Sequence, residues 1–341
     1  MTNYKILFMH QGPHLSTRNF AKIIGADFKF TGWSFKTLEF HKVPKIVQKI
    51  FNLPIILMNF ICLFRRAFSL PSYDIYLCEG FTPSIAAVIN KTFINRRSTI
   101  ITLAIGLPVY WNRYFFKKIY SHIDGVICVS NLCKEFIKKY ANCPIRIVHP
   151  YIREDRYREL EKIDPNLENY IIISIGSGTY IKGMDILVEA FKIVKREIKK
   201  AELYIIGKPH PKEWRKIKGV HIKGYVENIT PYLRKASLYV QSSRSDAFPI
   251  ASIEALRAGI PALVTDTVGT KEIVEKLDKN LIRKISSKDL AEGILYYFNL
   301  PFHLKRELSR EAKKLSTSFC TEEACHVFLE EFSALIRQIK N

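Results

Sequence analysis

Two carboxylates, Asp246 and Glu254, stand eight residues apart in a segment that is otherwise mostly small and apolar. Ionised carboxylates only accept hydrogen bonds, so they suit the hydroxyl groups of sugars and ribose. Glu254 lies between Ile253 and Ala255, which we expect to be buried, and a carboxylate beside a core needs a polar partner. Asp246 stands just ahead of an expected helix, where an acid is commonly only a cap. Glu254 is therefore the stronger indication of a bound ligand.

A second segment combines glycines with a basic residue. Gly176 and Gly178 follow an apolar run, and Lys182 and Gly183 stand at the start of a helical pattern. Glycines let the backbone approach a phosphate closely, and a lysine can neutralise its charge. Glycines after a strand often do no more than make the turn, so this segment alone does not decide between the two interpretations.

The elements that must position these residues are those of an α/β protein. Short β-branched runs alternate with longer helical patterns from Lys5 to His149, which is typical of parallel sheets covered by helices. A polar stretch, Arg153–Glu168, interrupts the pattern and is the best linker candidate. The alternation restarts at Tyr170, and the helical pattern Gly183–Ile198 has a clean apolar stripe.

A chain of 341 residues suits two domains. We predict a Rossmann-like domain over residues 1–155 and a second one over residues 156–321. A C-terminal helix at about 322–341 can pack back on the first. In such sheets ligands bind beyond the carboxyl ends of the strands. The helix after Asp246 should start near Pro249 and end at Gly259.

The net charge of +21 is concentrated in the first half, where residues 1–155 hold 21 Lys and Arg against 8 Asp and Glu. Such a surface attracts anionic lipid, phosphorylated substrates or nucleic acid. Zinc-finger spacings and basic-aromatic repeats are absent from the sequence, which disfavours a nucleic-acid-binding protein. Residues Lys42–Arg66 mix basic and apolar side chains, as an interfacial helix on an anionic membrane does, and a crossover helix packed on the sheet explains them equally well.

Seven scattered cysteines without a Cys-x-x-Cys pair indicate buried thiols in a reducing compartment. The sequence has no run long and apolar enough to span a membrane, and its start reads as a strand and turn without a cleavage site. We therefore expect a cytoplasmic protein, with peripheral contact at the cytoplasmic face of the membrane. The nine histidines lack ligand spacing and there is no Asp-x-Asp motif, so we expect no metal site.

Several motifs in their order and spacing resemble the retaining glycosyltransferases of family 4, also called glycosyl transferases group 1. The resemblance covers some 270 residues and implies the GT-B fold, two Rossmann-like domains whose parallel sheets face each other across a cleft. It also implies that the domain over residues 1–155 binds the acceptor and that the domain over residues 156–321 binds the nucleotide sugar. It is carried by Asp124-Gly-Val-Ile-Cys-Val-Ser130, Arg146-Ile-Val-His-Pro-Tyr-Ile152, Gly-x-x-x-x-x-Lys-Gly at Gly176–Gly183, the acid-x7-Glu spacing of Asp246 and Glu254, and Gly-x-Pro-x-x-x-x-Asp at Gly259–Asp266.

By this resemblance, Lys182 and Asp246 are the catalytic residues. Lys182 would stabilise charge on the leaving diphosphate, and Asp246 would bind the donor sugar's hydroxyls. Glu254 would hold the nucleotide ribose. The resemblance implies further contacts with the donor at Gly12, Gly176, Ser177, Val226, Ala247, Phe248 and Pro249. Among these, Ala247 and Phe248 would act through their backbone N–H groups, Pro249 would start the helix, and Val226 would flank the base.

The resemblance also implies transfer with retention of anomeric configuration, with no cofactor beyond the nucleotide-diphosphate sugar and no metal. Three residues depart from the family pattern: Asp246 replaces the usual glutamate, Ser177 stands where an arginine is usual, and Ala104 stands near the usual place of a histidine. A shifted donor or weakened catalysis would follow. The alternatives are a GT-B sugar-nucleotide epimerase or phosphorylase, and a catalytically weak protein that binds a sugar nucleotide.

Overall fold

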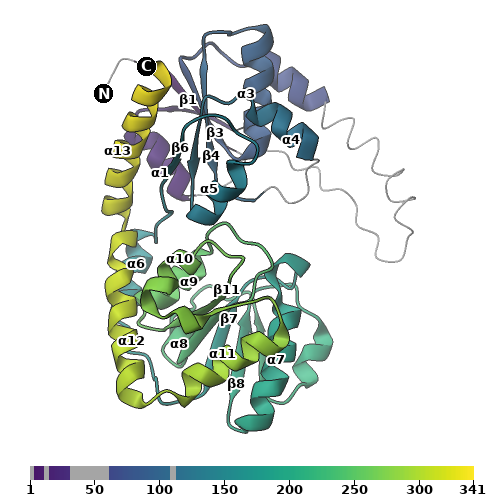
Figure 1. Ribbon diagram of the computed structural model, residues 1–341, viewed down its shortest axis with the longest axis vertical. Helices are drawn as coiled ribbons and strands as arrows, with labels where there is room; N and C mark the ends of the chain where they lie inside the picture. The colour runs from purple at the N-terminus through teal and green to yellow at the C-terminus, as the bar shows by residue number, and fades with distance from the viewer. Residues whose placement is uncertain (1–3, 11–14, 31–60, 108–112) are drawn as a thin grey trace, which may run out of the picture. The chain divides into compact units, whose positions relative to one another are not determined.

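The computed structural model describes residues 4–10, 15–30, 61–107 and 113–341, and the chain divides into two compact units. Unit 1 comprises Met1–Cys128, Phe136–Ile147 and Phe328–Asn341, and unit 2 comprises Val129–Glu135 and Val148–Val327. Each unit is built on one parallel sheet with helices packed against it (Figure 1).

The sheet of unit 1 has six parallel strands in the order β2-β1-β3-β4-β5-β6 within the described residues. Its central strands are mostly apolar and buried along almost their whole length, because both faces of a parallel sheet are covered. The strands are β1 (Ile6–His10), β2 (Asp27–Phe30), β3 (Ile75–Glu79), β4 (Thr99–Ala104), β5 (Gly125–Cys128) and β6 (Ile145–Ile147).

Helices follow most of these strands in the described part of the first 147 residues: α1 (Leu15–Ile23), a helical stretch at 61–68, α3 (Phe81–Phe93), α4 (Arg113–Tyr120) and α5 (Asn131–Ile137). Helix α3 packs on β3 and β4. The end of the C-terminal helix α13 (Thr321–Lys340) also belongs to unit 1. Its Phe328 ring stacks on Phe20 with 4.5 Å between centroids, and Arg146 donates to Gln338 at 2.9 Å.

The sheet of unit 2 also has six parallel strands, in the order β12-β11-β10-β7-β8-β9. The chain starts in the middle at β7, builds outward to β9, and then returns to β10 on the other side of β7. The strand order therefore reverses between β7 and β10. The strands are β7 (Ile171–Ile175), β8 (Glu202–Ile206), β9 (Val220–Gly224), β10 (Leu238–Gln241), β11 (Ala262–Thr265) and β12 (Ile282–Arg283).

The helices of unit 2 cover this sheet, with α7 and α11 packed on each other and α9 packed on β10, β11, α6 and α12. They are α6 (Glu154–Glu161), α7 (Met184–Glu197), α8 (Thr230–Leu233), α9 (Ile250–Arg257), α10 (Lys271–Leu277), α11 (Ser287–Asn299) and α12 (Phe302–Leu315). Short 3₁₀ turns lie at Tyr180–Lys182, Lys212–Lys216, Lys279–Leu281 and Thr317–Phe319.

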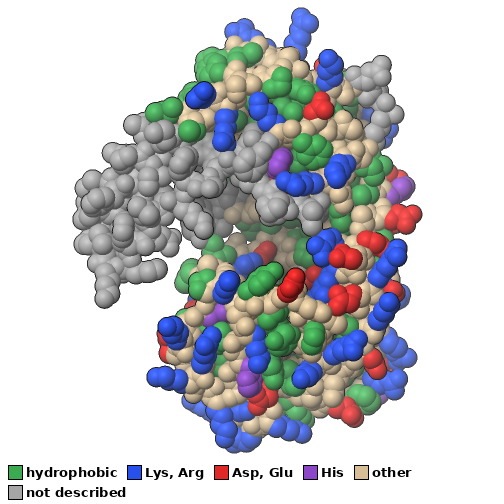
Figure 2. Space-filling view, turned by 180° about the vertical axis from the view of Figure 1, so that it is seen from behind, with side chains coloured by type: hydrophobic (Ala, Val, Ile, Leu, Met, Phe, Trp, Pro, Cys, Tyr) green, Lys and Arg blue, Asp and Glu red, His purple; other side chains and the backbone are tan. Residues whose placement is uncertain are grey.

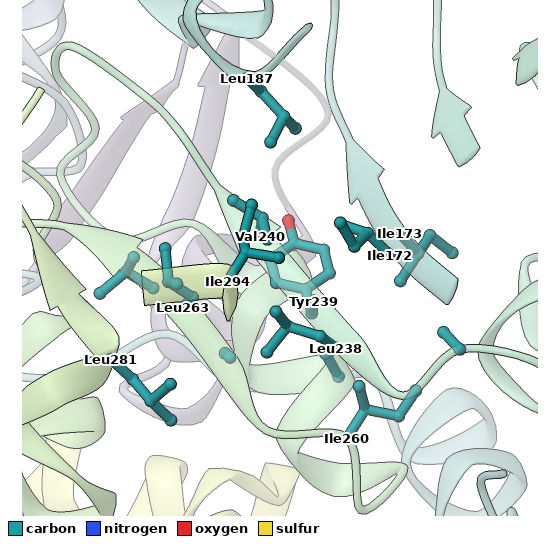
Figure 3. Packing of buried hydrophobic residues seen from close by; sticks show 14 of the residues in the cluster. Ile172, Ile173, Leu187, Leu238, Tyr239, Val240, Ile260, Leu263, Leu281 and Ile294 are labelled. Carbon is teal, nitrogen blue, oxygen red and sulfur yellow. The ribbon is translucent and has the colours of Figure 1, made fainter. Parts of the chain in front are cut away.

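The core of unit 2 is a continuous apolar cluster around Tyr239 of β10, which is fully buried (Figure 3). Neighbours on β7, such as Ile172 and Ile173, and on α7, such as Leu187, are fully buried as well. The Tyr239 hydroxyl donates to Gln241 at 2.6 Å, so its burial leaves no unpaired donor. The adjacent strands β7 and β10 are thus tightly packed at the centre of the sheet.

The predicted α/β class with two parallel sheets is confirmed. The prediction of a linker over Arg153–Glu168 is wrong for 154–161, which form α6 inside unit 2. Two acids, Glu154 and Asp155, occupy the favourable first turn of this helix, and Leu160 is fully buried. The short outer strands β2 and β12 also went unpredicted.

No helix among the described residues is both long enough and apolar enough to cross a membrane. Of the predicted interfacial segment Lys42–Arg66, the residues up to 60 lie outside the described part, and those from 61 onward are helical.

Candidate active site

The candidate site lies at the carboxyl ends of β7 and β10, where the strand order of unit 2 reverses. These two strands pair directly, with Leu238 opposite Ile172 and Tyr239 opposite Ile173. In a doubly wound sheet the loops after such strands diverge to opposite faces and leave a crevice for a ligand. The loop after β7 carries Gly176 to Gly183, and the loop after β10 carries Ser242 to Pro249.

Hydrogen bonds join the two loops. The amide of Arg244 donates to the carbonyl of Ile181 at 2.7 Å, and the Ser242 hydroxyl donates to the carbonyl of Lys182 at 3.2 Å. Gly183 has φ 62°, in the left-handed region, and a Cβ there would overlap the carbonyl oxygen of Ser242. Glycine is therefore required at position 183, where the two loops approach each other.

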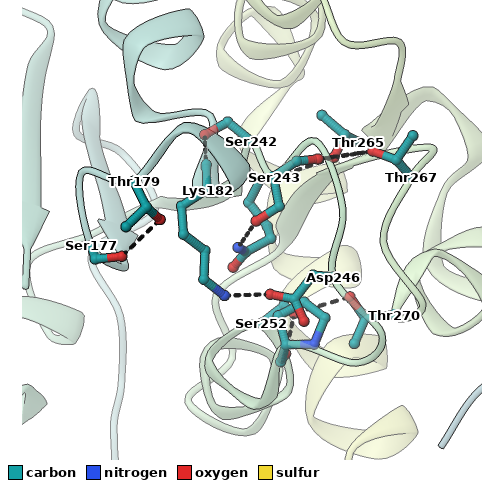
Figure 4. Close-up of polar contacts among 12 residues, drawn as sticks. Ser177, Thr179, Lys182, Ser242, Ser243, Asp246, Ser252, Thr265, Thr267 and Thr270 are labelled. Carbon is teal, nitrogen blue, oxygen red and sulfur yellow. Dashed lines mark hydrogen bonds and ion pairs between the residues drawn. The ribbon is translucent and has the colours of Figure 1, made fainter. Parts of the chain in front are cut away.

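Lys182 and Asp246 form an ion pair across the two loops, with 2.5 Å between Nζ and Oδ2 (Figure 4). The lysine side chain is 34% exposed and the aspartate side chain 15%. The structure thus brings the two residues predicted to be catalytic into direct contact. A partly exposed cation next to a carboxylate can bind a phosphate while the carboxylate accepts hydrogen bonds from hydroxyls.

The backbone around Asp246 is fixed from two sides. The amide of Gly269 donates to the Asp246 carbonyl at 3.0 Å, and the Ser130 hydroxyl donates to the Ala247 carbonyl at 2.7 Å. The same Ser130 oxygen accepts from the Cys133 amide at 3.1 Å, so it also caps α5.

Ala247 and Phe248 are buried, and the Phe248 ring stacks on His149 with 4.9 Å between centroids. Within the part of the chain that the structure describes, the amide groups of these two residues have no acceptor. They are therefore available to a ligand, whereas the Phe248 side chain is not. Pro249 is the N-cap of α9 rather than its first residue.

Glu254 lies on α9 in a largely buried position, with its carboxylate 3.6 Å from Nε of Arg156. Burial raises the pKa of Glu254, and the charge of Arg156 opposes that rise. Arg156 Nη1 also donates to Thr230 and to Glu159, each at 3.0 Å. The carboxylate is thus held by a network that reaches the start of α8.

Asp246 and Glu254 both lie near the end of β10. Burial above all raises the pKa of Tyr239 well above its usual value, and the charges of Asp246 and Glu254 add to this rise. Both carboxylates are therefore close enough to the end of β10 to act electrostatically on the same phenol.

The loop after β7 offers hydroxyls but no second cation. Ser177 Oγ lies 3.0 Å from Thr179 Oγ1 (Figure 4). Arg244, the nearest substitute for the arginine that Ser177 replaces, donates to both Asp185 oxygens at 2.8 and 2.6 Å and stacks on the Tyr180 ring. The Arg244 guanidinium is thus held in an ion pair with Asp185 of α7.

The remaining predicted site residues lie farther out or outside the described part. Val226 is half-buried and packs on the core after β9. It precedes Thr230, to which Arg156 donates a hydrogen bond. Gly176 donates its amide to the carbonyl of Ile206. Gly12 lies outside the described residues. No group of three or more His, Cys, Asp or Glu side chains in the described ranges is arranged for a metal ion.

Sequence reasoning missed Arg156, which stood in the stretch interpreted as a linker. A signal was present: Glu154 and Asp155 followed by Tyr157 and Leu160 at helical spacing predicts a short amphipathic helix.

The residues around this site match a known protein family. Residues 155–315 match the family described as glycosyl transferases group 1. This part of the chain is a group 1 glycosyl transferase domain. It contains Lys182, Asp246 and Glu254 together with the Arg156 network.

The group 1 domain has relatives of several kinds. An uncharacterised glycosyltransferase of Methanocaldococcus jannaschii is 29% identical over 62% of this chain and 60% of its own length. A putative teichuronic acid biosynthesis glycosyltransferase of Bacillus subtilis is 27% identical over 53% of this chain and 49% of its own length. The chain thus spans about half to three fifths of these curated relatives. A crystal structure of Anabaena HepE in complex with UDP and glucose shares the fold, with TM-score 0.73, 14% identity and coverage of 97% of this chain and 100% of that one.

The contact between Arg156 and Glu254 predicts a pH-dependent coupling. Folding raises the pKa of Glu254 above its usual 4.5, so the folded chain keeps this proton to higher pH than the unfolded chain. Stability is therefore lost as the pH rises through that window. We expect Arg156→Gln to lower the free energy of unfolding by about 2 kcal/mol at pH 8 and by less at pH 5, with much of the loss recovered when Glu254→Gln is added.

Urea denaturation at both pH values measures this coupling. Arg158→Gln is the matched control, because it removes the same charge from the same helix at an exposed residue that pairs with the exposed Glu154. Equal losses for Arg156→Gln at pH 5 and pH 8, or no recovery in the double variant, would contradict the account.

Proposed function

We propose that this protein is a retaining glycosyltransferase that moves a sugar from a nucleotide-diphosphate sugar to a glycan, lipid or lipid-linked acceptor. The observation that carries the proposal is the Lys182–Asp246 pair at the strand-order reversal of a group 1 domain, with Glu254 on the helix that follows. HepE, which shares the fold, is known in complex with UDP and glucose, and this supports a nucleotide sugar as the donor.

Each polar group of the site has a role in donor binding under this proposal. The diphosphate would lie against Lys182 and the backbone of Gly176 and Ser177, and the ribose hydroxyls would donate to Glu254. Asp246 would accept hydrogen bonds from the donor sugar, and the amides of Ala247 and Phe248 would donate to the sugar or the diphosphate. The partial positive charge of the α9 N-terminus supports anion binding there.

The proposed reaction breaks the bond between the anomeric carbon and the phosphate oxygen and forms a bond from that carbon to an acceptor hydroxyl oxygen on the same face. The hydroxyl proton moves to an oxygen of the departing diphosphate. Lys182 neutralises the charge that builds up on the diphosphate, and a preorganised cation in a partly buried site stabilises such charge effectively. Lys182 and the backbone amides would carry this charge without a metal ion.

We place the protein in the cytoplasm, in peripheral contact with the cytoplasmic face of the membrane. Reduced thiols and the excess of basic residues in the first half support this proposal.

A catalytically weak binder of nucleotide sugars is the second candidate. It is favoured by Ser177 and by the commitment of Arg244 to Asp185, which leave one cation at the diphosphate position in the described residues. A donor-hydrolysis assay separates the two, because a weak binder would bind the donor without releasing nucleoside diphosphate above the background of Glu254→Ala.

Donor binding is tested by thermal unfolding with a panel of nucleotide sugars. A donor at 100 times its dissociation constant should add about 2.7 kcal/mol to the free energy of unfolding of the wild type. We expect Glu254→Ala to abolish the shift and Lys182→Ala to lower kcat by about 100-fold or more with a smaller change in KM. Absence of any shift across the panel would overturn the proposal.

The stereochemistry and the metal requirement are tested together on the active enzyme. Proton NMR of the first product should show the anomeric configuration of the donor, and EDTA should leave the rate unchanged. Inversion at the anomeric carbon would contradict the retaining mechanism. Loss of activity with EDTA, restored by Mg²⁺, would contradict the role given to Lys182.

A further inference from the structure

The helical stretch 61–68 of unit 1 turns apolar side chains outward. Ile61, Phe64, Arg65 and Phe68 are exposed and follow the i, i+3, i+4, i+7 spacing of a single helix face. The opposite face buries Leu63 and Ala67. A surface helix of a soluble domain normally directs only one apolar stripe inward and keeps the other face polar. This helix has a second apolar stripe in contact with solvent.

The outward stripe continues onto the end of α3. Phe68 stacks on Phe93 with 6.0 Å between ring centroids, and Asn90 donates to the carbonyl of Ala67 at 2.8 Å, which fixes the two helices together. Phe93 is 63% exposed and Ile94 50%. We define the aromatic–arginine face as these apolar residues and the exposed arginines among and beside them: Ile61, Phe64, Arg65, Phe68, Phe93, Ile94, Arg96 and Arg97.

The charge of this face is positive and uncompensated. In the described part of the chain no carboxylate pairs with Arg65, Arg96 or Arg97, and the sequence has no Asp or Glu at 40–73 or at 80–123. The acids on neighbouring elements have partners: Asp124 pairs with Lys91 at 2.6 Å, and Asp27 accepts from Tyr73 at 2.7 Å. Figure 2 shows hydrophobic side chains next to basic ones on this unit.

We propose that the aromatic–arginine face docks on the surface of an anionic lipid bilayer. Aromatic and aliphatic side chains enter the boundary between headgroups and acyl chains, while arginines bind the lipid phosphates. Nucleic acid fits less well, because a phosphate backbone offers nothing to the aliphatic side chains of Ile61 and Ile94. The inference deepens the proposed function, since a docked enzyme would meet a lipid or lipid-linked acceptor.

Vesicle sedimentation of the full chain tests the inference without any donor. Wild type should bind vesicles of one-third phosphatidylglycerol and two-thirds phosphatidylcholine at about 0.05 M salt and release them at about 0.5 M salt. The variant Arg65→Gln/Arg96→Gln/Arg97→Gln should lower the partition coefficient by about 100-fold. Phe64→Ser/Phe68→Ser should lower it by at least about 10-fold.

The matched control is Arg196→Gln/Lys199→Gln/Lys218→Gln, which removes three exposed charges from unit 2 and should leave binding unchanged. Thermal unfolding of each variant verifies the fold. The inference would be overturned if the control variant lost as much vesicle binding as the arginine variant, or if the wild type did not bind vesicles at low salt. It would also be overturned if the protein bound single-stranded RNA through the same three arginines but did not bind vesicles. UDP binding is measured separately. If the protein binds UDP but not vesicles, only the docking proposal is overturned. If it binds vesicles but not UDP, only the proposed function is overturned.

Discussion

The arrangement of the site depends on the ion pair between Lys182 and Asp246 and on the parallel pairing of β7 with β10 that makes it possible. The two residues are 64 positions apart in the sequence, and only the adjacency of these strands at the point where the sheet order reverses brings their loops together. Without a ligand, the lysine is neutralised by the aspartate. Under the proposed function, a bound diphosphate would be a second anion for the same cation, so Lys182 would be shared between two negative partners.

The second constraint is the cost of burying Glu254. Its position on α9 removes the carboxylate from water and raises its pKa, while Arg156 opposes this by offering a positive charge at 3.6 Å. Arg156 is held in turn by Glu159 and Thr230. Under the proposed function, a carboxylate shielded from water in this way would be a stronger acceptor for ribose hydroxyls than a solvated one, because fewer water molecules compete for it. The same network ties α6, α8 and α9 into one support.

The sequence was sufficient for the α/β class and for the proximity of Lys182 to Asp246, because parallel strands end at one edge of a sheet and the motifs follow those strands. It was insufficient for Arg156, since the pattern that predicts the short helix α6 does not show which of its side chains reaches Glu254. It also could not reveal that Arg244 is engaged by Asp185, because the direction of a long side chain depends on how two loops pack. The outward apolar stripe at 61–68 was likewise ambiguous, as an apolar residue in a sequence does not show which side of its helix is covered.

The competition for Lys182 is tested most directly by calorimetric titration of UDP into wild type and Asp246→Asn. The substitution removes the competing anion and keeps the size of the side chain. The account predicts that UDP binds Asp246→Asn more tightly, by about fivefold, the factor that corresponds to a partly exposed ion pair of about 1 kcal/mol. It also predicts that the additional affinity of a UDP-sugar over UDP is lost. Equal or weaker binding of UDP to Asp246→Asn would contradict the claim that the pair and the diphosphate share one cation.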